Sequence, residues 1–275
     1  MRKAQSLLLA GVTAACMAFQ LSQANATVVS GSSSSYGEAV SLELTPFLGT
    51  AVDVTSGPIP TASGSAPGMY NQTNSVLSAT LLNLITTGVI NASANSNIDG
   101  SPGMKLAAAS ASVDQLGVSI LGALGIGASV IEAEALASGD YGALSATGTT
   151  TLAGLSLNGI PLINLTISPN DTLLSALGIT VTLNEQSGSG DGISSAGISV
   201  DAIHIAFDNV LYLGLDPSFG SSLGLLNGDI VISHAQANIF AVPNAATNPA
   251  PEPATLALLG TGLVGAFGMR KRRLA

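Results

Sequence analysis

Short segments in which apolar and polar residues alternate run through most of this chain, and turns rich in Gly, Ser and Asn separate them. In the segment 38–44, Val40, Leu42 and Leu44 fall on one face, which is the two-residue period of a half-buried strand. The segment 179–184 has the same period. The pattern predicts an all-β fold with a single β-sandwich-like domain. A β-solenoid is the alternative, because Gly and Ala are frequent, although no repeat of about 20–50 residues marks one.

The rest of the chain divides into further strands and expected loops. Strands are predicted at five other segments: 104–120, 127–138, 142–158, 196–207 and 229–240.

Residues 27–36 are rich in Ser and Gly and predict a mobile arm. Residues 55–70 carry several Gly and Pro and, like 187–192, predict loops. Residues 76–94 are apolar, and their periodicity leaves a helix and a buried strand equally open.

The first residues have the parts of a secretory signal peptide. Arg2 and Lys3 give a positive start, an apolar stretch follows, and Ala24 and Ala26 are small residues at the cleavage positions. We expect residues 1–26 to form a signal helix that the Sec machinery exports and that signal peptidase removes.

The single cysteine, Cys16, lies within the apolar stretch of this signal. A lipoprotein cysteine is the alternative, but such signals usually carry Leu three positions earlier, where this chain has Thr13. Without Cys16 the exported part has no cysteine, which excludes disulfides and thiolate metal sites in it.

The C-terminal end also has the form of a targeting signal. Its three parts, in order, are Pro251-Glu252-Pro253, an apolar run over residues 254–269, and Arg270-Lys271-Arg272-Arg273. A helix over the apolar run would reach roughly 24 Å, short of the ~30 Å hydrocarbon core of a bilayer. Basic residues beside a span stay on the cytoplasmic side. We therefore expect a hydrophobic helix in transient or permanent membrane contact, preceded by a linker at residues 244–250.

This three-part end resembles the PEP-CTERM sorting signal of Gram-negative bacteria, which an exosortase, a membrane-embedded cysteine protease, recognises and processes. The resemblance implies that Pro251, Glu252 and Pro253 open a sorting and anchor segment at residues 251–275, which ends in the basic stop cluster at 270–273. It further implies export through the cell envelope membrane to the surface or the extracellular space of a Gram-negative bacterium, in association with exopolysaccharide and biofilm.

The exported part is strongly acidic. Between residues 27 and 250, Lys105 is the one basic residue among fifteen acidic ones, a formal charge of −14. Such a charge repels phosphate backbones and argues against nucleic acid as a partner. Glu132 and Glu134 share one predicted strand face, where solvated acids are favoured over a glycosidase pair.

Six short segments follow one another along the central part of the chain: Tyr36-Gly37, Ala108–Val113, Gly148–Leu155, Val181–Gln186, Val200–Ile205 and Gly228–Ala235. In this order they resemble the choice-of-anchor P family of bacterial surface proteins, over roughly residues 31–240. The resemblance implies an ectodomain at residues 27–243 that carries no catalytic activity or cofactor.

One segment matches a catalytic pattern. Residues 220–224 have the G-x-S-x-G form of a serine hydrolase centred on Ser222, with Asp229 and His234 after it. A nucleophile elbow needs a strand before it and a helix after it, whereas the flanks here predict turns. We therefore expect no catalytic residue and no enzyme, with a secreted hydrolase using Ser222 as the alternative.

His204 and His234 are the only histidines, and both lie in predicted strands. With Asp201 or Asp229 they could hold a metal across strands. Partly buried, hydrogen-bonded imidazoles are the favoured interpretation, and no metal site is predicted. The strand period places each histidine with apolar neighbours: His234 with Ile230 and Ile232, and His204 with Val200 and Ala202.

Two Gly- and Asp-containing segments bear on calcium. Residues 95–100 copy the first half of an EF-hand loop, but the twelfth position holds Leu106 instead of Glu, so a turn held by Asn and Asp side chains is predicted. Residues 188–192 resemble a single Gly/Asp calcium repeat. No cofactor is expected, and a calcium-dependent adhesin is kept as an alternative function for so acidic a chain.

Overall fold

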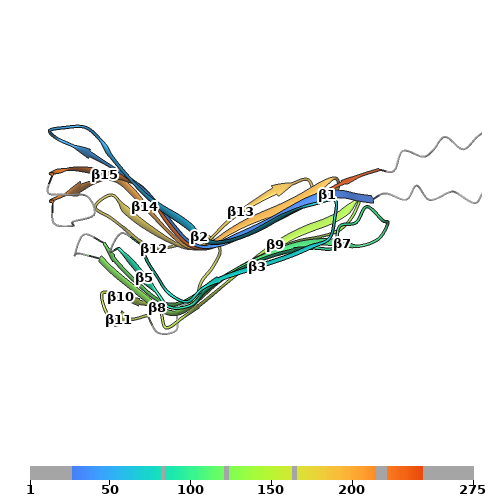
Figure 1. Cartoon of the computed structure of the whole chain (residues 1–275), viewed down its shortest axis with the longest axis horizontal. Coiled ribbons are helices and arrows are strands. Elements are labelled where there is room, and N and C mark those ends of the chain that lie inside the picture. The colour runs from blue at the N-terminus through green and yellow to red at the C-terminus, as the bar shows by residue number, and fades with distance from the viewer. Residues whose placement is uncertain (1–26, 82–83, 121–123, 163–165, 215–221, 244–275) are drawn as a thin grey trace, which may run out of the picture. The chain divides into compact units, whose positions relative to one another are not determined.

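The structure is a computed structural model that describes residues 27–81, 84–120, 124–162, 166–214 and 222–243 (Figure 1). Within these ranges the chain forms fifteen strands and no helix, which confirms the all-β prediction. The strands are β1 (Thr27–Pro46), β2 (Val52–Ala66), β3 (Tyr70–Val76), β4 (Ala79–Leu81), β5 (Ile85–Thr87), β6 (Ile90–Ser96), β7 (Lys105–Ile120), β8 (Leu124–Asp140), β9 (Ala143–Ala153), β10 (Ser156–Leu157), β11 (Ile160–Pro161), β12 (Asp171–Ala176), β13 (Ile179–Gly190), β14 (Ser195–Tyr212) and β15 (Gly224–Val242).

These strands belong to one compact unit, Ala26–Val242. The predicted signal helix at 1–26, linker at 244–250 and sorting segment at 251–275 lie outside the described residues. No helix among the described residues has the length and apolar character needed to cross a bilayer.

The strands form two antiparallel sheets, and neither closes on itself. In the first, called sheet A, the strand order is β12-β13-β14-β15-β1-β2. In the second, sheet B, the long strands run β3-β6-β7-β8-β9, and the shorter β4, β5, β10 and β11 complete it. The antiparallel ladders join strands of very different lengths, unlike the equal stacked coils of the solenoid alternative.

Three predicted non-strand segments proved to be strands. Residues 27–36, expected as a mobile arm, are the first half of β1, which lies between β15 and β2. Residues 55–66 of the predicted loop belong to β2, and 187–190 of the second loop belong to β13. The undecided segment 76–94 holds β4, β5 and part of β6. In each case pairing with neighbouring strands overrides the loop preference of Ser, Gly and Pro.

A row of irregular positions crosses sheet A. Asn184, Ala202, Ser233 and Gly37 lie opposite one another on β13, β14, β15 and β1, and the pairing register passes over all four. Asn184 and Ser233 have left-handed backbones, with φ of 52° and 59°. Along β14 the buried positions change there from even to odd numbers, because an irregular residue shifts the two-residue period.

Sheet B has a matching irregularity. Gln115 on β7, with φ of 52°, lies opposite Ser129 on β8, and the register again passes over both. Figure 1 shows that both sheets bend midway along their strands. We attribute the bend to these two rows, since bulged positions increase local twist and turn a strand.

The two sheets enclose one core whose composition differs on the two sides of the bend. One side is filled by large residues, among them Leu42, Leu44, Ile205, Leu226, Val118, Ile120 and Ile126. The other side is filled by small ones, among them Ser33, Ser35, Ala107, Ala109, Ala111, Ala133, Ala135, Ala137, Ala235 and Ala237.

Small side chains allow the sheets to approach closely enough for direct hydrogen bonds. Ser35 Oγ donates to the carbonyl of Ser93 in the facing sheet at 2.8 Å. Ser233 Oγ donates to the carbonyl of Ala111 at 2.7 Å and accepts from the amide of Ala133 at 2.9 Å. A serine can reach the opposite main chain only where sheets lie closer than the ~10 Å typical of stacked sheets.

Candidate functional site

Both histidines lie on the outer face of sheet A, next to the irregular row. The prediction of partly buried, hydrogen-bonded imidazoles is confirmed. Their predicted neighbours were wrong: Ile230 and Ile232 are buried in the core, whereas His234 is on the other face. The reason is the period shift at Ser233, which a strict alternation through the strand cannot foresee.

The first histidine, His204, lies between two carboxylates. Its Nδ1 pairs with Glu185 Oε2, and its Nε2 lies 2.9 Å from Asp229 Oδ1. Carboxylates only accept, so this arrangement favours the imidazolium, which donates from both nitrogens. The two acids lie at opposite ends of the ring and do not share a coordination point with it. Accordingly, no group of His, Cys, Asp or Glu among the described residues is arranged to hold a metal.

Opposing influences act on the pKa of His204. Burial lowers it, but the hydrogen bonds and charges of Asp229 and Glu185 together outweigh burial and raise the pKa above its ordinary value of 6.5. The stabilisation from these contacts is therefore complete below pH 6.5 and is lost as the pH rises through the folded-state pKa. For a partly exposed group we expect it to be worth less than about 1 kcal/mol.

We expect Asp229→Asn to lower the pKa of His204, because the substitution removes one of the two charges that favour the imidazolium. A proton NMR titration of the imidazole resonances measures this directly. Asp53→Asn, on the far edge strand β2, is the matched control and should leave the titration unchanged. An unchanged pKa in Asp229→Asn would contradict the arrangement.

The second histidine, His234, is held differently. Its Nδ1 lies 2.5 Å from Asp201 Oδ1, and its ring stacks on Tyr36 with centroids 4.4 Å apart and planes 14° apart. Burial, and then the charge of Asp201, raise the pKa of Tyr36 to about 12, so the phenol keeps its proton. Glu185, Asp201, His234 and Tyr36 are direct cross-strand neighbours, which makes the two histidine sites one continuous polar cluster.

A hollow of about 390 Å³ lies on the outer face of sheet B. Its lining is mostly small, hydroxylated or amidated: Ser93, Asn95, Ala108, Ser110, Glu134, Leu136, Thr147 and Thr149 among others. Glu134 Oε2 accepts from Thr149 Oγ1 at 2.9 Å, and Ser93 and Ser110 bond to each other at 2.8 Å. Glu132 shares this outer face as predicted, and burial followed by the charge of Glu134 raises its pKa.

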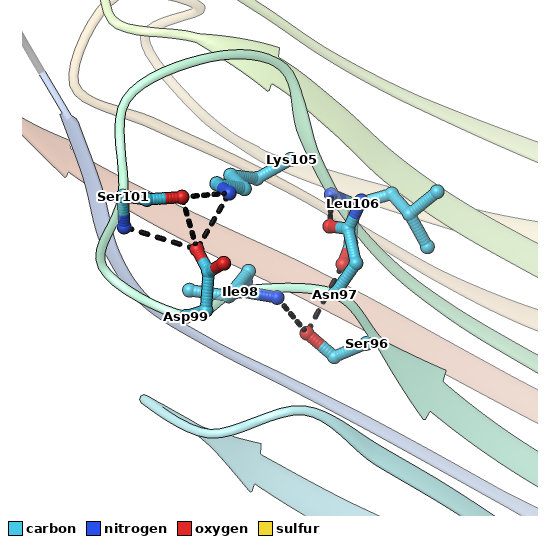
Figure 2. A network of polar contacts seen from close by, with 7 residues as sticks. All are labelled: Ser96, Asn97, Ile98, Asp99, Ser101, Lys105 and Leu106. Carbon is cyan, nitrogen blue, oxygen red and sulfur yellow. Dashed lines mark hydrogen bonds and ion pairs between the residues drawn. The ribbon is translucent and has the colours of Figure 1, made fainter.

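The first calcium-like loop is held by the protein's own cation. Lys105 Nζ lies 2.6 Å from Asp99 Oδ1 and 2.8 Å from Ser101 Oγ, as Figure 2 shows. The hydroxyl and amide of Ser101 also donate to Asp99, and the Asn97 side chain accepts from the amide of Leu106. The bond from Lys105, and then those from Ser101, hold the pKa of Asp99 well below its usual range. The predicted Asn/Asp turn is confirmed, and an ammonium group occupies the place where a calcium ion would need free oxygens.

The second calcium-like loop is a tight turn. Asp191 accepts from the amides of Ile193, Ser194 and Ser195 and from the hydroxyl of Ser194. The backbone amide of Ser195 and then that of Ile193 are the leading causes of the depressed pKa of Asp191. The carboxylate oxygens of Asp191 therefore accept the hydrogen bonds that close the β13–β14 hairpin.

The hydrolase pattern does not assemble a triad. Ser222 immediately precedes β15, whereas Asp229 and His234 lie along that same extended strand. At about 3.3 Å per residue, the ten steps from Gly224 to His234 extend over roughly 30 Å, far beyond hydrogen-bonding distance. His234 pairs instead with Asp201 on β14.

Among the buried polar residues that the sequence reasoning missed, Glu38 and Ser233 are completely buried. Glu38 is 0 % exposed, and neither carboxylate oxygen has a hydrogen-bond partner among the described residues. Burial raises its pKa to about 7. The alternation pattern contained this signal, since Glu38 has the same parity as the buried Val40 and Leu42. No sequence signal marked Ser233, which bridges the sheets.

Comparison with known proteins bears on the C-terminal end. Residues 249–273 match the family described as the PEP-CTERM protein-sorting motif. No curated protein and no solved structure matches the chain. The comparisons give no support to the resemblance of residues 31–240 to the choice-of-anchor P family. The chain thus carries a PEP-CTERM protein-sorting motif at its C-terminal end, which supports export and exosortase-dependent sorting.

Proposed function

We propose that this chain is a non-enzymatic surface or matrix protein of a Gram-negative bacterium, delivered by its C-terminal motif and active through binding by its β-strand unit. The PEP-CTERM match at residues 249–273 is the observation that carries the proposal. In this account signal peptidase cleaves after Ala26, and an exosortase acts at Pro251-Glu252-Pro253. The basic cluster at 270–273 holds the tail in the membrane until then.

The described surface supports binding to an extracellular polysaccharide. The hollow on sheet B offers hydroxyl, amide and carboxylate groups side by side with Ala108 and Leu136, a mixture that suits the polar and apolar faces of sugars. The formal charge of −14 between residues 27 and 250 disfavours acidic polymers. A neutral or amino-bearing polysaccharide is therefore the partner that the surface suits best.

The sorting tail can be tested by the intact mass of the protein recovered outside the producing cells. We expect the recovered mass to lack residues 1–26 and residues 254–275, with the protein co-sedimenting with the polysaccharide layer. Replacing Pro251, Glu252 and Pro253 together with Ala should leave the tail attached and the protein in the membrane fraction. Pro243→Ala, outside the motif, is the control and should be processed normally. Removal of the tail from the triple variant would contradict the proposal.

A further inference from the structure

The strand β3 forms an unprotected edge of sheet B. It pairs with β6 through all seven of its residues, from Tyr70 to Val76. On its other side no backbone hydrogen bond is made to any described residue. Residues 71–75 are exposed on both faces of the strand and contain no charge, proline or glycine. Such an edge is open to pairing with another strand.

The other long edges are guarded. On β2, Pro58 and Pro60 interrupt the edge, and the Asn74 side chain donates to the carbonyl of Thr61 at 2.5 Å. On β9, the Gln186 side chain donates to the carbonyl of Gly148 at 3.1 Å, and the amide of Leu144 donates to Gly192 at 2.9 Å.

The remaining edges are short. At the far edge of sheet A, β12 has six residues and a register shift, and β4 and β11 have three and two residues. Proline, capped carbonyls, bulges and shortness are the usual protections of edge strands. Among the described edges, β3 has the greatest length without these protections. The side chain of its own Asn74 reaches Thr61 of β2, but no backbone hydrogen bond joins the two strands.

We propose that β3 pairs with β3 of a second copy of this chain, antiparallel and about a two-fold axis at Thr73. The strand sequence argues for a second copy, because a two-fold pairing brings its own small polar residues opposite one another. Two units of formal charge −14 repel overall, so a contact between them must lie where neither presents acids. The strip formed by residues 71–75 and the neighbouring Asn91, Ser93 and Asn95 of β6 is uncharged.

The pairing is self-complementary. Antiparallel strands centred on Thr73 place Asn71 opposite the partner's Ser75, and Ser75 opposite the partner's Asn71. These are small polar side chains that can hydrogen-bond across the junction. Because the operation is two-fold, the contact closes as a dimer and leaves no further free edge of this kind. Ser93 and Asn95 line the hollow one strand away, so the dimer would join two hollows on one continuous sheet face.

The oligomeric state of the exported protein, measured by analytical ultracentrifugation, tests the proposal. The native protein should be dimeric, and its dimer should tighten as salt screens the repulsion between the acidic units. Asn71→Lys with Ser75→Lys places like charges opposite each other twice and should weaken the dimer about tenfold or more. Asn71→Lys with Ser75→Asp places opposite charges there and should remain dimeric. The matched control, Ser145→Lys with Thr151→Lys on β9, adds the same charge elsewhere and should also remain dimeric.

A second measurement does not depend on weakening the interface. The exported part has no cysteine, and Thr73→Cys places the new thiol on the two-fold axis. Opposed strand residues lie within the distance that a disulfide spans, so oxidation should give a covalent dimer. Thr151→Cys is the control and should stay monomeric on a denaturing gel. A monomeric native protein, an unweakened double-lysine variant or an uncrosslinked Thr73→Cys would each overturn the proposal.

Discussion

Ser233→Ala should lower the free energy of unfolding by about 2 kcal/mol, because it removes the two buried hydrogen bonds that the Ser233 hydroxyl makes to the facing sheet. The Ser233 hydroxyl is the shared partner of the Ala111 carbonyl and the Ala133 amide, and the serine is 0 % exposed. Alanine and serine meet similar backbone strain at the φ of 59°, so strain largely cancels in the comparison. Denaturant unfolding followed by circular dichroism gives the difference.

The control for this substitution is Ser41→Ala. Ser41 lies on the neighbouring strand β1 with its side chain exposed, and its loss should change stability by no more than about 0.5 kcal/mol. Ala111 and Ala133 face each other on β7 and β8. If Ser233→Ala costs less than about 1 kcal/mol, their main-chain groups must pair directly once the hydroxyl is gone, and the bridge between the sheets would be dispensable.

Much of the fold was predictable because most strands obey the two-residue period. The predicted segments 104–120 and 127–138 became β7 and β8, and 196–207 and 229–240 lie within β14 and β15. In each, the alternation of a strand that is buried on one face only is interrupted at one irregular position, Gln115, Ser129, Ala202 or Ser233. The alternation on either side was enough to predict a strand, but not which residues share a face.

The failures concern segments whose composition suits loops. Residues 27–36 read as a mobile arm because Ser and Gly have low strand propensity. They are strand because they face the small-residue side of the core, where Ser33 and Ser35 fit between closely spaced sheets. A Cβ on Gly31 would come within 2.6 Å of Ile98 Cδ1, so glycine there serves the approach of the sheets. The local sequence does not show how close a facing sheet lies.

Four of the six members of the polar cluster were predictable, whereas Glu185, Tyr36 and the geometry were not. His204, His234, Asp201 and Asp229 were identified from residue type alone, and all four meet on sheet A. Their orientation depends on the irregular row at Ser233, where a left-handed backbone moves the following residues to the other face. Serine seldom adopts a left-handed backbone conformation, and the residues around Ser233 in the sequence do not predict it.

Glu38→Gln should stabilise the protein at pH 8 by about 2 kcal/mol and leave it unchanged near pH 4. Glu38 is buried opposite Ile232 and Ile59, and burial raises its pKa to about 7 from the ordinary 4.5. A full shift of this size corresponds to about 3 kcal/mol, of which relaxation of the protein around the buried charge removes part. Glutamine has the shape of the protonated acid and never acquires the charge.

The direction of the effect follows from proton binding. Between pH 4.5 and about 7 the folded chain holds a proton on Glu38 that the unfolded chain has released, so stability falls as the pH rises through that window and is then level. All other groups titrate in both proteins and cancel in the difference. Glu43→Gln, at an exposed position of the same strand, is the control and should change the stability at pH 8 by no more than about 0.5 kcal/mol. A pH-independent difference for Glu38→Gln would mean that its carboxyl is solvated or paired in the folded protein.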